Sequence, residues 1–155
     1  MLKSATIKFL KDLKKNNNKP WFEAHRKEYE AAKIDFATFI QAVIDKHSKS
    51  DPTIKSTVAK DCMFRINRDV RFSKDKSPYK TNMGAYINRG GKKSVFAGYY
   101  FHCEPGQCFV GGGLWMPMTL TVRPAMSVFN RVLMVSAGSV GSGGLMAMVS
   151  KCREE

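Results

Sequence analysis

The chain has 155 residues, 43% of them hydrophobic and 25% charged, and this length fits one domain with a substantial buried core. Its 26 lysines and arginines outnumber 13 acidic residues, so the formal net charge of +13 predicts an anionic partner, for which nucleic acid is one candidate. No apolar run reaches the ~18 residues of a membrane span, and lysines interrupt the N-terminal segment as they would not in a secretory signal. We therefore expect a cytoplasmic protein without a membrane partner, with its cysteines as thiols.

Two helices are predicted at the N-terminus. The first ends near Lys15, where three consecutive asparagines follow. Pro20 suits the first turn of the second helix, in which apolar residues recur at helical spacing until about His47. The apolar stripe of the first helix comprises Ile7, Leu10 and Leu13.

Beyond a polar connection, the hydrophobic period changes from that of a helix to that of a strand. Strands are predicted over residues 61–67, 83–88, 94–104 and 107–110, with glycine-containing turns at 90–91 and 105–106. Short turns between successive strands favour antiparallel pairing. The fold class is therefore α+β, with two N-terminal helices packed on a mostly antiparallel sheet of about four strands.

The stretch from 65 to 80 holds the strongest candidate site, with six basic and two acidic residues. Guanidinium groups bind phosphate or carboxylate oxygens two at a time, so arginines at three-residue spacing could surround one anion. An aromatic residue here, Phe72 or Tyr79, could pack on a base or sugar. The predicted ligand-binding residues are Arg65, Arg68, Arg71, Phe72, Lys74, Lys76, Tyr79 and Lys80.

Three interpretations of this stretch stay open. In the first, it binds a phosphate-containing or other anionic ligand, for which nucleic acid is one candidate. The affinity then falls steeply as the salt concentration rises. Alternatively, it belongs to an enzyme acting on a phosphorylated substrate, in which Asp69 or Asp75 is the catalytic proton acceptor or a metal ligand. In the third interpretation, the arginines form a purely structural lattice of ion pairs.

Other motifs give weaker signals. His25 and His102 are second candidates for a general base. His102, Cys103 and Cys108 lack a CxxC pair and a nearby second histidine, so no metal site is predicted, and no pattern specifies a cofactor. Glycines 111–113 could bring backbone N–H groups to an anion or simply bend a strand end.

The segment RINRDVRFSKDKSPYKTN resembles the signature of a bacterial family of conserved hypothetical proteins, domain of unknown function 2461. The opening FLKDLKKNNNKPWFEAHRKEYE and the run GYYFHCEPGQCFVGGGLW are also similar to that family, so the resemblance spans about residues 6–117. The resemblance implies no reaction, because the activity of the family is itself unassigned.

The composition changes after Gly111, since no acidic residue occurs before Glu154. We therefore expect a single α+β domain over residues 1–117 and an atypical, poorly ordered tail over residues 118–155. Members of the family continue with charged helices, which are not evident here. A reading-frame shift or a premature end near Met116 is one hypothesis for the difference.

Overall fold

The computed structural model describes residues 2–92, 94 and 96–113, and the expected tail at 118–155 lies outside them. In chain order these residues form α1 (Ser4–Lys15), α2 (Lys19–Ala24), α3 (Arg26–His47), the short 3-10 helix η1 (Pro52–Ile54), α4 (Ala59–Cys62), β1 (Met83–Asn88), β2 (Gly98–Cys103) and β3 (Phe109–Gly113). The fold is α+β, as the sequence predicts. None of the helices in the described residues is long and apolar enough to cross a membrane.

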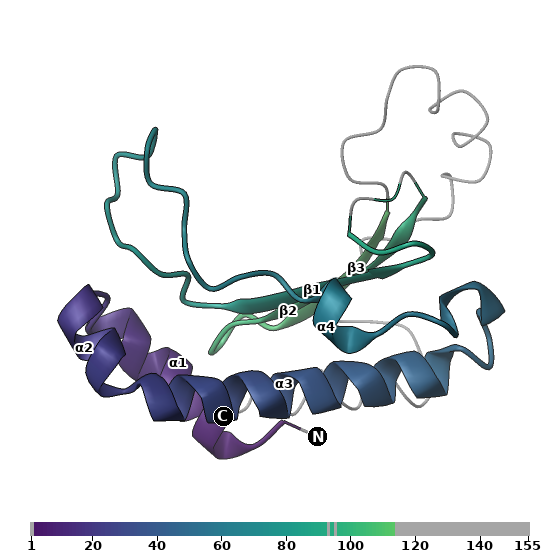
Figure 1. The fold of residues 1–155 in the computed structure, drawn as a ribbon, viewed down its shortest axis with the longest axis horizontal. Helices are drawn as coiled ribbons and strands as arrows, with labels where there is room; N and C mark the ends of the chain where they lie inside the picture. Colours follow the sequence, from purple (N-terminus) through teal and green to yellow (C-terminus); the bar gives the residue numbers. More distant parts are fainter. Residues whose placement is uncertain (1, 93, 95, 114–155) are drawn as a thin grey trace.

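Helix α3 forms the base on which the rest of the domain packs (Figure 1). It runs along one face of the sheet, and α1 packs against it. Phe36 and Phe39 of α3 contact Phe101 of β2, with ring centroids 6.1 and 5.0 Å apart. Each aromatic ring buried in this way contributes roughly 1.5–3 kcal/mol. The core therefore lies between α3 and the sheet.

The three strands form an antiparallel sheet in the order β1-β2-β3. Because side chains alternate between the two faces of a strand, those of Ala85, Ile87 and Phe101 lie on the face that packs against α3. The side chains of Tyr86, Tyr100, His102 and Phe109 take the alternate positions and define what we call the outer face, the face of the sheet away from α3. This face receives no helix from the described part of the chain.

Two local expectations were wrong. The helix predicted from Pro20 to His47 is broken at His25, whose backbone leaves the helical region and whose ring nitrogen Nδ1 donates to the Trp21 carbonyl at 2.9 Å. The strand predicted over residues 61–67 is instead the end of α4 and a segment outside the sheet. This segment meets β1 through the isolated bridge of Met63 with Ala85 and a hydrogen bond from the Phe64 N–H to the Gly84 carbonyl. The sheet therefore has one strand fewer than expected.

The three described cysteines, Cys62, Cys103 and Cys108, are all buried. Cys62 and Cys103 are buried thiols, and burial raises the pKa of Cys62 to about 11 and that of Cys103 to about 12. The Sγ of Cys108 lies 3.3 Å from the Glu104 carbonyl oxygen. The two thiols stay protonated at neutral pH and have little nucleophilic character.

Candidate functional site

The charged stretch predicted as the site forms a long loop that projects past the end of the sheet (Figure 1). Its two ends are joined by backbone hydrogen bonds, from Arg68 N–H to the Pro78 carbonyl at 2.9 Å and from Lys80 N–H to the Ile66 carbonyl at 2.8 Å. We call residues 67–78 the signature loop. Arg65 and Lys80, which flank this loop in the sequence, line the same wall of a cavity on the outer face.

Within the signature loop, the arginines pair with the loop's own carboxylates. Arg71 binds Asp69 with both ends of its guanidinium, at 2.9 Å from Nε to Oδ1 and 2.7 Å from Nη2 to Oδ2. Arg68 forms an ion pair with Asp75. These pairs do not converge on one anion, and they have the form expected of a structural lattice.

The two aspartates are weak bases in this arrangement. Hydrogen bonds from the Arg71 side chain and backbone lower the pKa of Asp69. Hydrogen bonds from Ser77 and Arg68 hold the pKa of Asp75 well below its ordinary value. A carboxylate stabilised in its ionised form takes up a proton less readily, so each is a weaker general base than an ordinary aspartate.

The other predicted residues of the stretch point in different directions. Tyr79 is buried, and its ring stacks on Phe22 with centroids 3.9 Å apart. Its backbone is held by the Asn17 side chain, which donates to the Tyr79 carbonyl at 2.8 Å and accepts from its N–H at 3.1 Å. Phe72 is 96% exposed. Lys74 is exposed, and exposed Lys76 donates to the Val70 carbonyl at 3.0 Å.

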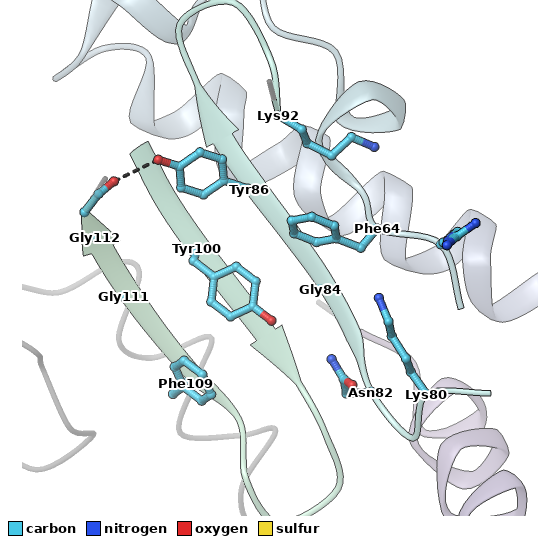
Figure 2. Close-up of a pocket in the computed structure, with 12 residues that line it drawn as sticks. Phe64, Lys80, Asn82, Gly84, Tyr86, Lys92, Tyr100, Phe109, Gly111 and Gly112 are labelled. Carbon is cyan, nitrogen blue, oxygen red and sulfur yellow. Dashed lines mark hydrogen bonds between the residues drawn. The ribbon is translucent and has the colours of Figure 1, made fainter. Parts of the chain in front are cut away.

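A cavity of about 540 Å³ lies on the outer face (Figure 2). This volume falls within the ~300–1,000 Å³ of small-molecule sites. Aromatic rings, basic side chains and glycines line it, and no described lining residue is acidic. The lining residues are Phe64, Arg65, Lys80, Asn82, Gly84, Tyr86, Lys92, Tyr100, Phe109, Gly111, Gly112 and Gly113.

Glycine at position 84 lets an aromatic ring form the floor of the cavity. A Cβ built on Gly84 would lie 3.0 Å from the Tyr100 hydroxyl oxygen and 3.3 Å from a Tyr100 ring carbon, too close for an undisturbed side chain. Tyr100 therefore leans from β2 across β1, with its hydroxyl directed towards Asn82 and Lys80 (Figure 2). The glycines of β3 border the cavity without side chains, and Gly113 accepts a hydrogen bond from the Tyr86 hydroxyl at 2.8 Å.

Three cations line one side of the cavity around Phe64. The ammonium groups of Lys80 and Lys92 lie 5.6 and 5.8 Å from the centre of the Phe64 ring. Partial burial, and then the positive charge of Arg65, lower the pKa of Lys80. Lys92 also donates a hydrogen bond to the Met63 carbonyl. Adjacent like charges repel each other, and an anion placed between them would relieve that repulsion.

A hydrogen-bonded chain of side chains starts at the cavity floor. The hydroxyl of Tyr100 lies 3.0 Å from Nδ1 of His102, and Nε2 of His102 lies 3.3 Å from Oε2 of Glu104. Partial burial raises the pKa of Glu104, but hydrogen bonds from His102, Thr81 and Lys14 outweigh it, so that pKa is lowered and the carboxylate stays ionised. His102 thus belongs to a defined network beside the cavity. His25 does not line it and stacks on Trp21 with centroids 4.1 Å apart.

The site in the structure combines predicted and unpredicted residues. Of the predicted ligand-binding set, Arg65 and Lys80 line the cavity. Sequence reasoning did not select Phe64, Tyr86, Tyr100 or Lys92, although alternation along the strands places Tyr86 and Tyr100 on one face. No cluster of three potential metal-ligating side chains occurs in the described part of the chain.

Comparison with known proteins gives one match. The model of the family described as conserved hypothetical protein (DUF2461) matches residues 5–125. No curated protein and no solved structure shows a significant match. The matched range contains all but the first residue of the helices, the signature loop, the sheet and every residue that lines the cavity. The chain belongs to the conserved hypothetical protein family DUF2461.

Proposed function

We propose that the cavity on the outer face binds a small anionic ligand that carries a flat ring and a phosphate group, such as a mononucleotide. The observation that carries the proposal is the convergence of Arg65, Lys80 and Lys92 beside an aromatic floor. Phosphate oxygens prefer guanidinium and ammonium partners, and every base has a face that stacks on an aromatic ring. The lining therefore offers both halves of such a ligand a matching partner.

The electrostatics of the wall support an anion more than a neutral ligand. In the described residues neither Arg65 nor Lys80 forms an ion pair, whereas Arg68 and Arg71 of the signature loop are both paired. The lowered pKa of Lys80 reflects burial and a neighbouring cation. A phosphate group bound here would place a counter-charge beside Lys80.

Single-stranded nucleic acid is the second candidate, and a specific observation favours it. The signature loop extends the basic surface away from the cavity and carries exposed Phe72, with the Arg71 guanidinium 5.9 Å from its ring centre. Single-strand binding proteins commonly combine basic tracks with stacking aromatic side chains. In this case one nucleotide of the strand occupies the cavity, and the adjacent nucleotides lie along the signature loop.

A binding titration separates these candidates. A fluorescent adenine nucleotide and a labelled oligonucleotide would be titrated into the protein at several salt concentrations, with Lys80→Met and Lys74→Met compared with the parent chain. Loss of a charged hydrogen bond of about 1.5–3 kcal/mol predicts at least tenfold weaker nucleotide binding in Lys80→Met. Lys74→Met is the matched control, because Lys74 lies on the signature loop outside the cavity.

Each result has a definite meaning. Weakening by Lys80→Met alone, for both probes, supports the cavity as the anion site. Weakening of the oligonucleotide by both variants supports the nucleic-acid candidate. If Lys80→Met, confirmed to be folded by circular dichroism, binds both probes as tightly as the parent, the cavity is not an anion site.

A further inference from the structure

The outer face carries a second arrangement, a chain of acid–base groups that ends at the cavity. Strand alternation places Tyr100 and His102 on the same face of β2, and Glu104 follows at the end of the strand. Only Tyr100 of the three lines the cavity. A polar chain running from a cavity floor to a carboxylate is the arrangement that activates hydroxyl groups in many enzymes.

The hydrogen-bond partners assign the direction of this chain. The carboxylate of Glu104 only accepts, so Nε2 of His102 carries the hydrogen and donates to it. Nδ1 is then the acceptor, and both the Tyr100 hydroxyl at 3.0 Å and the Asn82 amide nitrogen at 3.3 Å lie within reach to donate to it. The free electron pair of the imidazole therefore faces the Tyr100 proton.

The surroundings hold each member in place. Phe109 stacks on the His102 ring at 4.7 Å between centroids. Thr81 donates to Oε1 of Glu104 at 3.1 Å, and Lys14 forms an ion pair with the same oxygen at 3.4 Å. Side chains fixed in this way lose little entropy when a reaction proceeds. The chain is thus ordered before any ligand arrives.

We infer that Tyr100, His102 and Glu104 form a proton relay, in which Tyr100 is the catalytic group that removes a proton from the cavity's ligand. The ligand proton passes to the Tyr100 oxygen as the Tyr100 proton passes to Nδ1 of His102. Glu104 stabilises the resulting imidazolium, so His102 and Glu104 act on the ligand only through Tyr100. The inference rests on the proposed function only for the identity of the ligand, which the cations of the cavity wall would orient.

The relay can be tested without knowing the substrate, because it also predicts a reactive tyrosine. The probes are 4-(fluorosulfonyl)benzoate, which is anionic, and benzenesulfonyl fluoride, which is neutral. In the reaction the Tyr100 oxygen bonds to sulfur, the S–F bond breaks, fluoride leaves with the electron pair, and the hydroxyl proton goes to Nδ1 of His102. Labelling rates at each tyrosine and lysine would be measured by mass spectrometry of peptides.

Near neutral pH we expect both probes to label Tyr100 and to label Tyr99 far more slowly. Tyr99 is the matched control, because it lies on the same strand but on the other face, with its hydroxyl hydrogen-bonded to Asp51 at 3.1 Å. General base assistance typically contributes about 10²–10⁴-fold, so His102→Asn should slow labelling at least tenfold. Asparagine keeps a hydrogen-bonding group near the position of Nδ1 but cannot accept the proton. Glu104→Gln should have a smaller effect.

The pH dependence distinguishes a relay from a structural role. Burial raises the pKa of Tyr100 above the ordinary tyrosine value of about 10. Once the pH exceeds this raised pKa the hydroxyl ionises without help, so His102→Asn should approach the wild-type rate there. Equal rates near neutral pH overturn the inference, as does labelling of Lys80 and Lys92 without Tyr100. A deficit that persists unchanged after Tyr100 has ionised also overturns it, because His102 then only holds the ring in place.

The two probes keep this test separate from that of the proposed function. If the neutral probe labels Tyr100 with the expected dependence on His102, the relay stands even where nucleotide binding is absent. If nucleotides bind but neither probe shows that dependence, the proposed function stands and the relay is wrong.

Discussion

Asp75, one of the two predicted catalytic residues, holds a turn of the signature loop in place. Its carboxylate accepts from the Ser77 backbone at 2.9 Å and from the Ser77 hydroxyl at 2.6 Å, and it pairs with Arg68. These interactions close a turn within the signature loop and occupy three of the roughly four lone-pair sites of the carboxylate. The sequence places Asp75 among basic residues, but it does not say which of them the carboxylate meets.

The carboxyl group of Asp75 should titrate well below an ordinary aspartate. Hydrogen bonds from Ser77 and Arg68 lower its pKa in the folded loop. The stabilisation is therefore fully present above the unfolded pKa of about 3.9 and is lost as the pH falls through the lower folded value. The measurement is the chemical shift of the Ser77 amide proton as a function of pH.

The control for this titration is Asp75→Asn, in which the low-pH transition at Ser77 should vanish. A transition with an ordinary aspartate midpoint in the parent chain would show that the loop does not hold the conformation described here.

At the scale of elements, the helices and strands were more predictable than the connections. The stripe of Ile7, Leu10 and Leu13 gives α1, and all three residues are buried. Alternation gives β1 over Met83–Asn88 as predicted. The segment around Met63 was misassigned because alternation over residues 62–67 does not by itself show that the segment pairs along its length with a neighbouring strand; only Met63 and Asn67 form isolated bridges. The helix break at His25 depends on a single side chain that competes for a backbone carbonyl.

The candidate site could be predicted only in part, for a related reason. A cluster of charges is visible in the sequence, and Arg65 and Lys80 at its two ends do line the cavity. Whether the charges between them face a ligand or each other depends on how the loop folds back. Lys92 comes from the connection between β1 and β2 and Tyr100 from β2, and only the folded chain brings them to the same cavity.

Tyr79 and Phe72, the two aromatic residues of the charged stretch, allow the stability contributions of a buried and an exposed ring to be compared. Tyr79→Ala should destabilise the protein by about 3–5 kcal/mol, as other large aromatic truncations in cores do, because its ring stacks on Phe22 in the core. Phe72→Ala should change the unfolding free energy by less than about 0.5 kcal/mol, because the ring is almost fully exposed. Urea unfolding measures both.

Similar losses in the two variants would contradict the assignment of Tyr79 to the core and Phe72 to the surface. If Phe72→Ala instead weakens oligonucleotide binding without a change in stability, the signature loop belongs to the binding surface.

At the scale of the whole molecule, the sheet divides the domain into a stabilising side and a chemical side. Packing against α3 supplies the core, while the outer face holds the cations, the rings and the relay. This division leaves the outer face able to carry groups that do not help the protein fold. The net charge of +13 then adds a general cost of repulsion.

A cation kept for binding should lower stability in the absence of ligand. The pKa of Lys80 is lowered in the folded protein by burial and by Arg65, so its charge opposes folding below the unfolded pKa of about 10.4, and stability rises as the pH increases towards that value. Lys80→Met should therefore raise the urea midpoint near neutral pH while it weakens anion binding.

Lys33→Met is the control for this comparison, because Lys33 is exposed and pairs with Glu30 on α3. It should leave the midpoint nearly unchanged. A lower midpoint in Lys80→Met would mean that the methylene groups or the charge of Lys80 contribute to the fold.

The contact between Asn17 and Tyr79 also has a kinetic consequence. It closes a loop of 62 residues, whereas each strand pairs with its neighbour along the chain. Closing a long loop carries an entropy cost that local hairpins avoid, so this contact should form late, after the rate-limiting barrier to folding. A ligand held at the base of the signature loop would then act mainly by slowing the first step of unfolding, and would lengthen the lifetime of the native state more than it shortens the time needed to reach it.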